Sequence, residues 1–119
     1  MAANAAVCVA AATGEAVPGL LGPDGKDSGG GLHPGLPWAG CTVLAASAEQ
    51  LAELRAKAAG SDGMFVADMP GLAQRTRVYD EYLERLGEVA DTETDYYAVG
   101  LIGPRNRIDK LTRKLSLLS

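Results

Sequence analysis

Residues 2 to 12 read AANAAVCVAAA, and Asn4 is their only strongly polar side chain. Alanine has the highest helix propensity, so this segment predicts a helix. Thr13 and Gly14 are expected to end it. A helix that is apolar on every face must be covered on more than one face. Any fold of this chain therefore has to bury the helix inside the domain or against a partner.

The rest of the chain alternates short apolar runs with amphipathic stretches. Its 119 residues suit one domain, taken as residues 1–119, and only six side chains are aromatic, so small and aliphatic residues must supply the core. Strands that alternate with helices indicate an α/β domain with a largely covered sheet. The predicted strands are 41–46, 63–68, 95–103 and a closing strand at 115–118, and the predicted helices are 47–60, 70–89 and one that starts at Pro104.

Local signals support these helices. Ser47 and Gln50 have the S-x-x-Q spacing of a capping box at the start of the helix 47–60. The stretch 70–89 has apolar residues at mixed spacings of three and four, which predicts the longest helix of the chain. The last helix is expected to place three aliphatic side chains on its inner face: Ile108, Leu111 and Leu115.

Residues 18–37 are rich in glycine and proline, and the sequences GPDGK and SGGGLHPG supply turn residues twice. A loose surface hairpin is expected here, since connections of this length are functional or disordered. His33 is the only imidazole of the chain. Its near-neutral titration makes it the best candidate for a general base, and the alternative is an exposed histidine without a role.

Composition excludes several classes of protein. A net charge of −4 restricts any nucleic-acid contact to a local patch. Cys8 and Cys41 lack C-x-x-C spacing and are predicted to be buried, reduced thiols. One histidine and scattered carboxylates give no metal-ligand spacing, so neither a metal nor a cofactor is expected. The first apolar run lacks a cationic leader and is too short to cross a bilayer, which predicts a cytoplasmic protein without a membrane contact.

The C-terminal segment 103–118 is basic, with five cations and one acid. Arg105 and Arg107 fall in the first turn of the last helix, where the helix dipole favours acids. Free backbone N–H groups and two guanidiniums together suit a phosphate or carboxylate. The alternative is that both arginines pair with the acid-rich tract 80–95, within the chain or between subunits.

Two further polar residues are candidates for a site. Asp68 follows a predicted strand and precedes a helix, which is where α/β sheets usually present ligand groups. It could orient a water or a substrate amine there, or it could cap the following helix. Asn4 is expected to be hydrogen-bonded internally or to face a cleft.

The segment GLIGPRNRIDKLTRKLSLL at 100–118 resembles the closing segment of type II peptidyl-tRNA hydrolases: a strand, Gly-Pro, a helix with Ile-Asp-Lys, and a terminal strand. It is still more similar to a bacterial family of domains of unknown function, the one numbered two thousand, that is grouped with these hydrolases. The supporting stretches are AANAA at 2–6, GPDGKDSGGGLHPG at 22–35 and VADMPGLAQRTRVYDEYL at 66–83. The resemblance implies a three-layer sandwich in which helices cover a mixed sheet of about four strands.

The chain departs from the hydrolase motifs at most of the polar positions. In the pattern Gly-Lys-x-x-Ala-Gln-x-x-His-Ala, Asn4 stands at the Gln position and Val7 at the His position. In the later Asp-Ala-Gly region, Asp68 and Gln74 are retained, but Ala73 replaces the threonine. The resemblance therefore leaves Asp68 as the surviving member of the hydrolytic set, with Asn4 and Gln74 as cleft candidates.

Members of the resembled families begin with a buried strand and a Pro-Gly turn before the AANAA helix, and their lysine would precede Met1. The resemblance thus predicts a sheet that is one strand short. Each buried backbone group left without a partner costs roughly 1–3 kcal/mol. We expect dimerisation, strand exchange or a rerouted segment 18–37 to supply the missing hydrogen bonds.

Two functions follow from these patterns. The first is a non-catalytic binding or assembly domain that forms a homo-oligomer. A partner of the basic segment would be tRNA or a small anionic ligand. The second is a hydrolase of an aminoacyl- or peptidyl-tRNA or a similar ester or amide, with Asp68 and His33 as catalytic residues and Arg105 and Arg107 on phosphate. The first is favoured, because three of the four polar hydrolase positions are empty and the net charge opposes tRNA.

Overall fold

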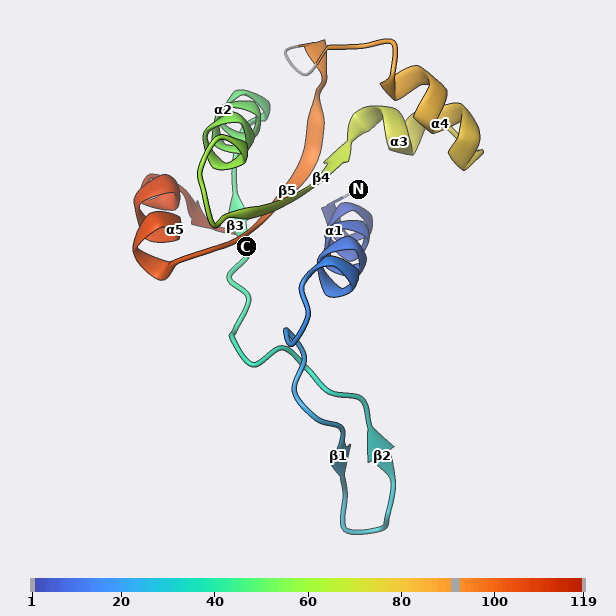
Figure 1. Cartoon of the computed structure of the whole chain (residues 1–119), viewed down its shortest axis with the longest axis vertical. Coiled ribbons are helices and arrows are strands. Elements are labelled where there is room, and N and C mark those ends of the chain that lie inside the picture. The colour runs from blue at the N-terminus through green and yellow to red at the C-terminus, as the bar shows by residue number, and fades with distance from the viewer. Residues whose placement is uncertain (1, 91–92, 119) are drawn as a thin grey trace.

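The computed structural model describes residues 2–90 and 93–118. Helices and strands alternate along most of the chain, and a hairpin projects from the body (Figure 1). The helices are α1 (Ala2–Ala16), α2 (Ala48–Ala59), α3 (Gly71–Arg75), α4 (Tyr79–Leu86) and α5 (Arg105–Thr112). The strands are β1 (Gly25–Lys26), β2 (Leu32–His33), β3 (Leu44–Ala45), β4 (Phe65–Pro70), β5 (Tyr96–Ile102) and β6 (Ser116–Leu117).

Strands β4 and β5 form an antiparallel pair at the centre of the body. Phe65 lies opposite Ile102 at one end of the pair and Pro70 lies opposite Tyr96 at the other, with an irregularity after Met69. Both strands are apolar along most of their length, as expected for strands covered on both faces. Both predictions of strands in this region are confirmed to within two residues.

Helices α1 and α2 cover opposite faces of this pair (Figure 1). Ala67 and Asp68 are neighbours on β4, so their side chains point to opposite faces. Asp68 contacts Arg55 of α2. Gly100, which lies opposite Ala67 on β5, packs against Val9 of α1. The centre of the molecule is therefore a helix, a two-stranded ribbon and a second helix.

The sheet is smaller than the resemblance predicts. The strand pairs are β1–β2, β3–β6 and β4–β5, so the described residues form three two-stranded antiparallel sheets instead of one mixed sheet of about four strands. From Phe65 to Met69 of β4 and from Tyr97 to Ile102 of β5, no backbone hydrogen bond to a segment other than the paired strand is found among the described residues. The mixture of helices and strands agrees with the predicted α/β class.

Three local predictions are confirmed. The Ser47 hydroxyl accepts a hydrogen bond from the Gln50 N–H at 3.2 Å, and the Gln50 side chain accepts one from the Ser47 N–H at 2.9 Å. The closing strand is present as β6, which pairs with β3. The residues predicted to face inward on α5 are all partly buried: Ile108, Leu111 and, just beyond the helix, Leu115.

Helix α1 continues past its predicted end to Ala16. The Thr13 hydroxyl donates to the Val9 carbonyl at 2.7 Å, and Gly14 follows inside the helix. Glycine within a helix costs only about 1 kcal/mol relative to alanine, so the helix tolerates Gly14.

The long helix predicted at 70–89 is wrong, because the chain breaks it into α3 and α4. Thr76 is extended, with φ −113° and ψ 142°, and its hydroxyl donates to the carbonyls of Leu72 at 3.1 Å and Ala73 at 3.4 Å. Val78 is extended as well. β-Branched residues lose side-chain freedom in a helix, and Thr76 and Val78 place two of them within three positions. The longest helix is instead α1.

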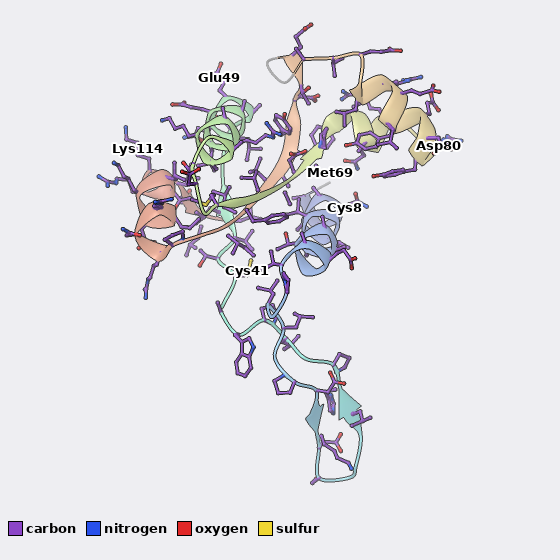
Figure 2. The ribbon with its side chains drawn as sticks, viewed as in Figure 1. Cys8, Cys41, Glu49, Met69, Asp80 and Lys114 are labelled. Carbon is purple, nitrogen blue, oxygen red and sulfur yellow. The ribbon has the colours of Figure 1, made fainter. Side chains whose placement is uncertain are left out.

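The core is thin and lies where α1 and α2 meet the ribbon. No large side chain among the described residues is fully buried. The predicted burial of both cysteines is wrong: Cys8 on α1 and Cys41 before β3 are exposed free thiols (Figure 2). Cys8 is open because α1 is covered on one side only, and Cys41 lies in the segment that leads from the hairpin to β3. The buried apolar residues are Ala5, Ala58, Ala67, Met69 and Tyr96.

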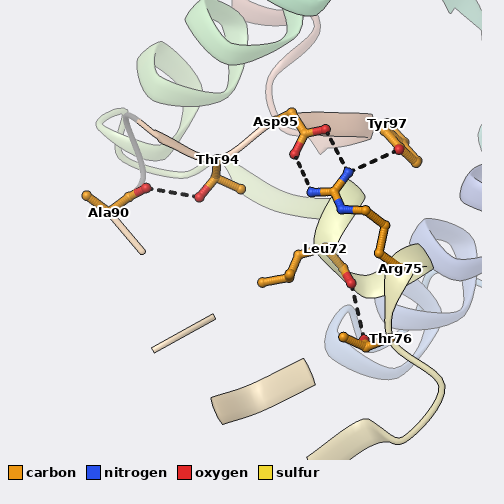
Figure 3. Close-up of polar contacts among 7 residues, drawn as sticks. All are labelled: Leu72, Arg75, Thr76, Ala90, Thr94, Asp95 and Tyr97. Atoms are coloured by element: carbon orange, nitrogen blue, oxygen red, sulfur yellow. Dashed lines mark hydrogen bonds and ion pairs between the residues drawn. The ribbon is translucent and has the colours of Figure 1, made fainter. Parts of the chain in front are cut away.

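An ion pair ties α3 to the start of β5 (Figure 3). The Arg75 guanidinium bonds both carboxylate oxygens of Asp95, at 3.2 and 3.3 Å, and donates to the Tyr97 hydroxyl at 3.3 Å. The Gly71 N–H donates to the Asp95 carbonyl at 2.9 Å. The hydrogen bonds from Arg75 lower the pKa of Asp95. This cluster fixes the direction in which the chain leaves β4.

Candidate functional site

Helices α2 and α5 lie side by side and leave an open groove of about 720 Å³ between them. Leu54, Leu111 and Leu115 contribute apolar, half-buried side chains to it. Figure 2 labels Lys114, which lies in the turn just after α5, and Glu49 on the neighbouring helix α2. The other charged lining residues are Glu53, Lys57, Arg107, Lys110 and Arg113. Five cations and one acid therefore surround an apolar floor.

Most of this positive charge is not neutralised. Lys57 pairs with Glu53 of the same helix at 3.0 Å. Arg107 donates to the backbone carbonyl of Asp62, a contact that leaves its charge uncompensated. The remaining cations of the groove form no ion pair with any residue that the structure describes. The groove is thus a positive surface on a chain of net charge −4.

The two arginines predicted to bind an anion lie in different places. Arg107 lines the groove, whereas Arg105 is exposed outside it. Neither pairs with the tract 80–95 inside the chain, so the intramolecular form of that alternative is wrong for the described residues. Two other arginines form ion pairs with acids of the tract: Arg85 pairs with Glu81 at 2.6 Å, and Arg75 pairs with Asp95.

Asp68 lies on the face of β4 that α2 covers. Its Oδ2 accepts a hydrogen bond from Arg55 Nε at 3.0 Å, and both side chains are about three-quarters buried. The Arg55 guanidinium also lies 5.1 Å from the centre of the Tyr96 ring, a cation–π geometry. Pro70 precedes α3 without any side-chain cap, so the prediction that Asp68 caps this helix is wrong.

Burial and the negative charge of Asp68 both affect the pKa of Tyr82 on α4. Burial raises the pKa of Tyr82, and the negative charge of Asp68 raises it further. Asp68 therefore belongs to a cluster with Arg55, Tyr96 and Tyr82 beside the ribbon. Asp68 lines neither the groove between α2 and α5 nor a second, smaller hollow of about 350 Å³ beside Leu51 and Tyr97.

His33 lies on β2 of the hairpin, which extends far from β4 (Figure 1). Its Nε2 is 2.9 Å from Oδ2 of Asp27, and both side chains are at least half exposed. The same carboxylate accepts the N–H groups of Gly29 and Gly31 at 3.0 and 2.9 Å. The structure therefore pairs His33 with Asp27 and does not bring it near Asp68.

We predict that the turn of this hairpin loosens in acid. The hydrogen bond with His33 and those from Gly31 and Gly29 lower the pKa of Asp27 from its ordinary 3.8. A depressed carboxyl pKa stabilises the folded turn above pH 3.8, and this contribution is lost as the pH falls through the lower, folded value. The amide resonances of Gly29 and Gly31 should follow that titration in NMR spectra. Asp27→Asn should abolish it, and a midpoint at or above 3.8 would contradict the prediction.

The cleft candidates Asn4 and Gln74 are both exposed. Asn4 Oδ1 lies 4.0 Å from the Cys8 thiol, and neither candidate lines the groove between α2 and α5 or the smaller hollow beside Leu51 and Tyr97. Among the described residues, no three His, Cys, Asp or Glu side chains are grouped so that they could hold a metal ion. None of the described helices combines the length and apolarity needed to cross a bilayer.

Sequence reasoning missed two partners. Arg55 reaches Asp68 across thirteen positions, and only the packing of α2 on β4 brings them together. Lys57 reaches the groove from a helix that precedes the basic segment by more than forty residues. The clustering of cations in 103–118 was the one signal available from the sequence.

Comparisons with known proteins bear on family and fold. The solved structure of Atu0240, a protein of unknown function from Agrobacterium tumefaciens strain C58, matches with a TM-score of 0.75 and 17% identity over 98% of this chain and 83% of that chain. At this identity the likeness shows the fold alone. Comparison with curated proteins gives no significant match. The model of a family described as protein of unknown function (DUF2000) matches residues 1–119, so the chain belongs to the DUF2000 family.

Proposed function

We propose that this protein is a non-catalytic binding domain that takes an anionic ligand in the groove between α2 and α5. The observation that carries the proposal is the concentration of five cations and one acid around that groove on an acidic chain. A volume of about 720 Å³ is in the usual range of ligand sites, roughly 300–1,000 Å³. Arginine binds carboxylate and phosphate with two parallel hydrogen bonds, and lysine supplies a compact point charge.

The groove favours a ligand with an apolar body and an acidic group. Three leucines form its floor while the cations stand around it, so a ligand could bury carbon and still neutralise the rim. The rest of the surface carries the excess of acids, which would repel a long polyanion beyond the groove. A small anion, or one local phosphate of a larger partner, fits this balance better than an extended nucleic acid.

Charge reversal at Lys110 tests this proposal, because Lys110 lines the groove while Arg105 of the same helix does not. We expect Lys110→Glu to weaken pyrophosphate binding at least tenfold, and Arg105→Glu by less than about twofold. Both substitutions change the net charge equally, so long-range effects are matched. Chemical-shift titration with pyrophosphate measures both affinities. Equal losses, or no shift at groove residues in the unaltered protein, would contradict the proposal.

The relation to type II peptidyl-tRNA hydrolases belongs to this proposal. The segment 100–118 resembles their ending, and Asp68 stands where their motif has aspartate. Val7 and Ala73 stand where the hydrolases have histidine and threonine. We infer that a hydrolase-like scaffold keeps binding without catalysis. Hydrolysis of an aminoacyl- or peptidyl-tRNA ranks second, because its remaining candidates Asp68 and His33 lie apart.

A further inference from the structure

Helix α1 is the most apolar helix of the chain and is nevertheless open to solvent. Of its fifteen residues, only Ala5 and Thr13 are buried, and Val7 is 67% exposed. One side of α1 packs on β4 and β5, so its other faces have no cover within the described chain. An apolar helix of this kind requires cover on more than one face.

The segment 17–43, here termed the arm, begins where α1 ends and projects away from the body (Figure 1). Backbone hydrogen bonds join the two sides of the arm: the Gly22 N–H donates to the Leu36 carbonyl at 2.8 Å, and the Trp38 N–H donates to the Leu20 carbonyl at 3.1 Å. The arm carries large apolar side chains that are mostly exposed: Leu32 (72%), Leu36 (77%) and Trp38 (74%). Isolated hairpins are marginally stable in water, so an ordered arm of this composition points to a surface on which it rests.

The excess surface has the size of an obligate interface. The chain exposes 8582 Å², whereas a monomer of 12.3 kDa typically exposes about 6,100 Å². Its radius of gyration is 16.1 Å, against about 13.5 Å for a compact domain of this length. The excess of about 2,500 Å² compares with the roughly 1,000–2,500 Å² that each subunit of an obligate dimer buries.

We propose that the arm and the uncovered side of α1 dock on a second copy of the same chain. A two-fold dimer places this surface on the same surface of its partner, so each molecule covers the other's apolar helix and both arms are buried at once. One chain carries both the uncovered helix and the arm, so two identical chains can each supply the surface that the other lacks. A membrane surface fits less well, because α1 has no lysine or arginine to contact lipid headgroups.

Trp38 is the only tryptophan and reports on the arm without any substitution. In the dimer we expect blue-shifted emission and protection from acrylamide, with a red shift as dilution separates the subunits. Light scattering coupled to gel filtration should give twice the mass of the 12.3 kDa chain at high concentration. A folded monomer at all concentrations, with Trp38 quenched as freely as in the unfolded chain, would overturn the proposal.

Paired variants locate the interface. Leu32→Ser with Leu36→Ser should raise the dissociation constant at least tenfold. Val78→Ser with Val89→Ser, which alters exposed valines near α4, should change it by less than about twofold. Equal effects of the two pairs would place the contact elsewhere and contradict the role of the arm. If the arm variant fails to fold, the dilution experiment on the unaltered chain still decides.

Discussion

Replacing Gly100 with alanine is expected to lower the free energy of unfolding by about 1–3 kcal/mol, because it overfills the contact between α1 and β5. A β-carbon at Gly100 would overlap Cγ1 of Val9, a short branched side chain that cannot move aside as the end of a long one can. The replacement would push α1 off the ribbon and expose the core around Ala5 and Ala67. Urea denaturation followed by circular dichroism measures the change.

Two further substitutions make this prediction specific. Gly14 lies in α1, the same helix as Val9, and a β-carbon added at Gly14 would have no neighbour within 4 Å. Gly14→Ala should therefore stabilise the protein by about 0.5–1 kcal/mol. Val9→Ala removes the group that a new β-carbon at Gly100 would strike. In the double variant with Gly100→Ala, most of the loss caused by the clash should disappear. Additive effects of the two changes would show that α1 does not pack here as the structure has it.

The parts of the fold that could be predicted from the sequence depend on local signals. The capping box of Ser47 and Gln50 and the Gly-Pro entry to α5 each involve residues a few positions apart. The break between α3 and α4 was missed because Thr76 and Val78 lie in a stretch whose apolar spacing suits a helix. There, the backbone preference of two β-branched residues outweighs the apolar periodicity.

Burial could not be predicted in the same way, since it depends on what covers each element. The run AANAAVCVAAA correctly predicts a helix, but composition does not tell what covers it or whether the cover comes from the same chain. Cys8 is exposed because α1 lies at the surface of the single chain. The error over Cys8 and the exposed arm thus have one physical cause, and the proposed second copy addresses both.

The candidate site was predictable only in part, for a related reason. Charge clustering pointed to Arg105 and Arg107, but the position of α5 across the groove from α2 decides that Arg107 lines the groove and Arg105 does not. Lys57 joins them from the other helix. Sequence spacing therefore identified the charged element, and tertiary packing selected the residues that face a ligand.

Asp68→Asn is expected to lower the free energy of unfolding by about 1–3 kcal/mol and to lower the pKa of Tyr82. The amide replaces a carboxylate that accepts a charged hydrogen bond from Arg55 at 3.0 Å in a site about three-quarters buried, so this charge-assisted bond is weakened where water cannot fully replace it. Burial remains the larger cause of the raised pKa of Tyr82, so that pKa should fall without reaching its ordinary 10.0. Denaturation and the NMR titration of the tyrosine ring carbons measure the two effects.

Glu81→Gln is the matched control, since it makes the same carboxylate-to-amide change on an exposed pair with Arg85. Its expected cost is below about 1 kcal/mol, as for other surface ion pairs. Equal stability of Asp68→Asn and the unaltered protein, with an unchanged pKa of Tyr82, would remove Asp68 from the cluster. The same variant decides the hydrolase alternative. If the unaltered protein releases amino acid from charged tRNA and Asp68→Asn abolishes this release, the result would favour catalysis. If the unaltered protein releases none while a type II hydrolase assayed in parallel does, Asp68 is left as a structural anchor between α2 and the ribbon.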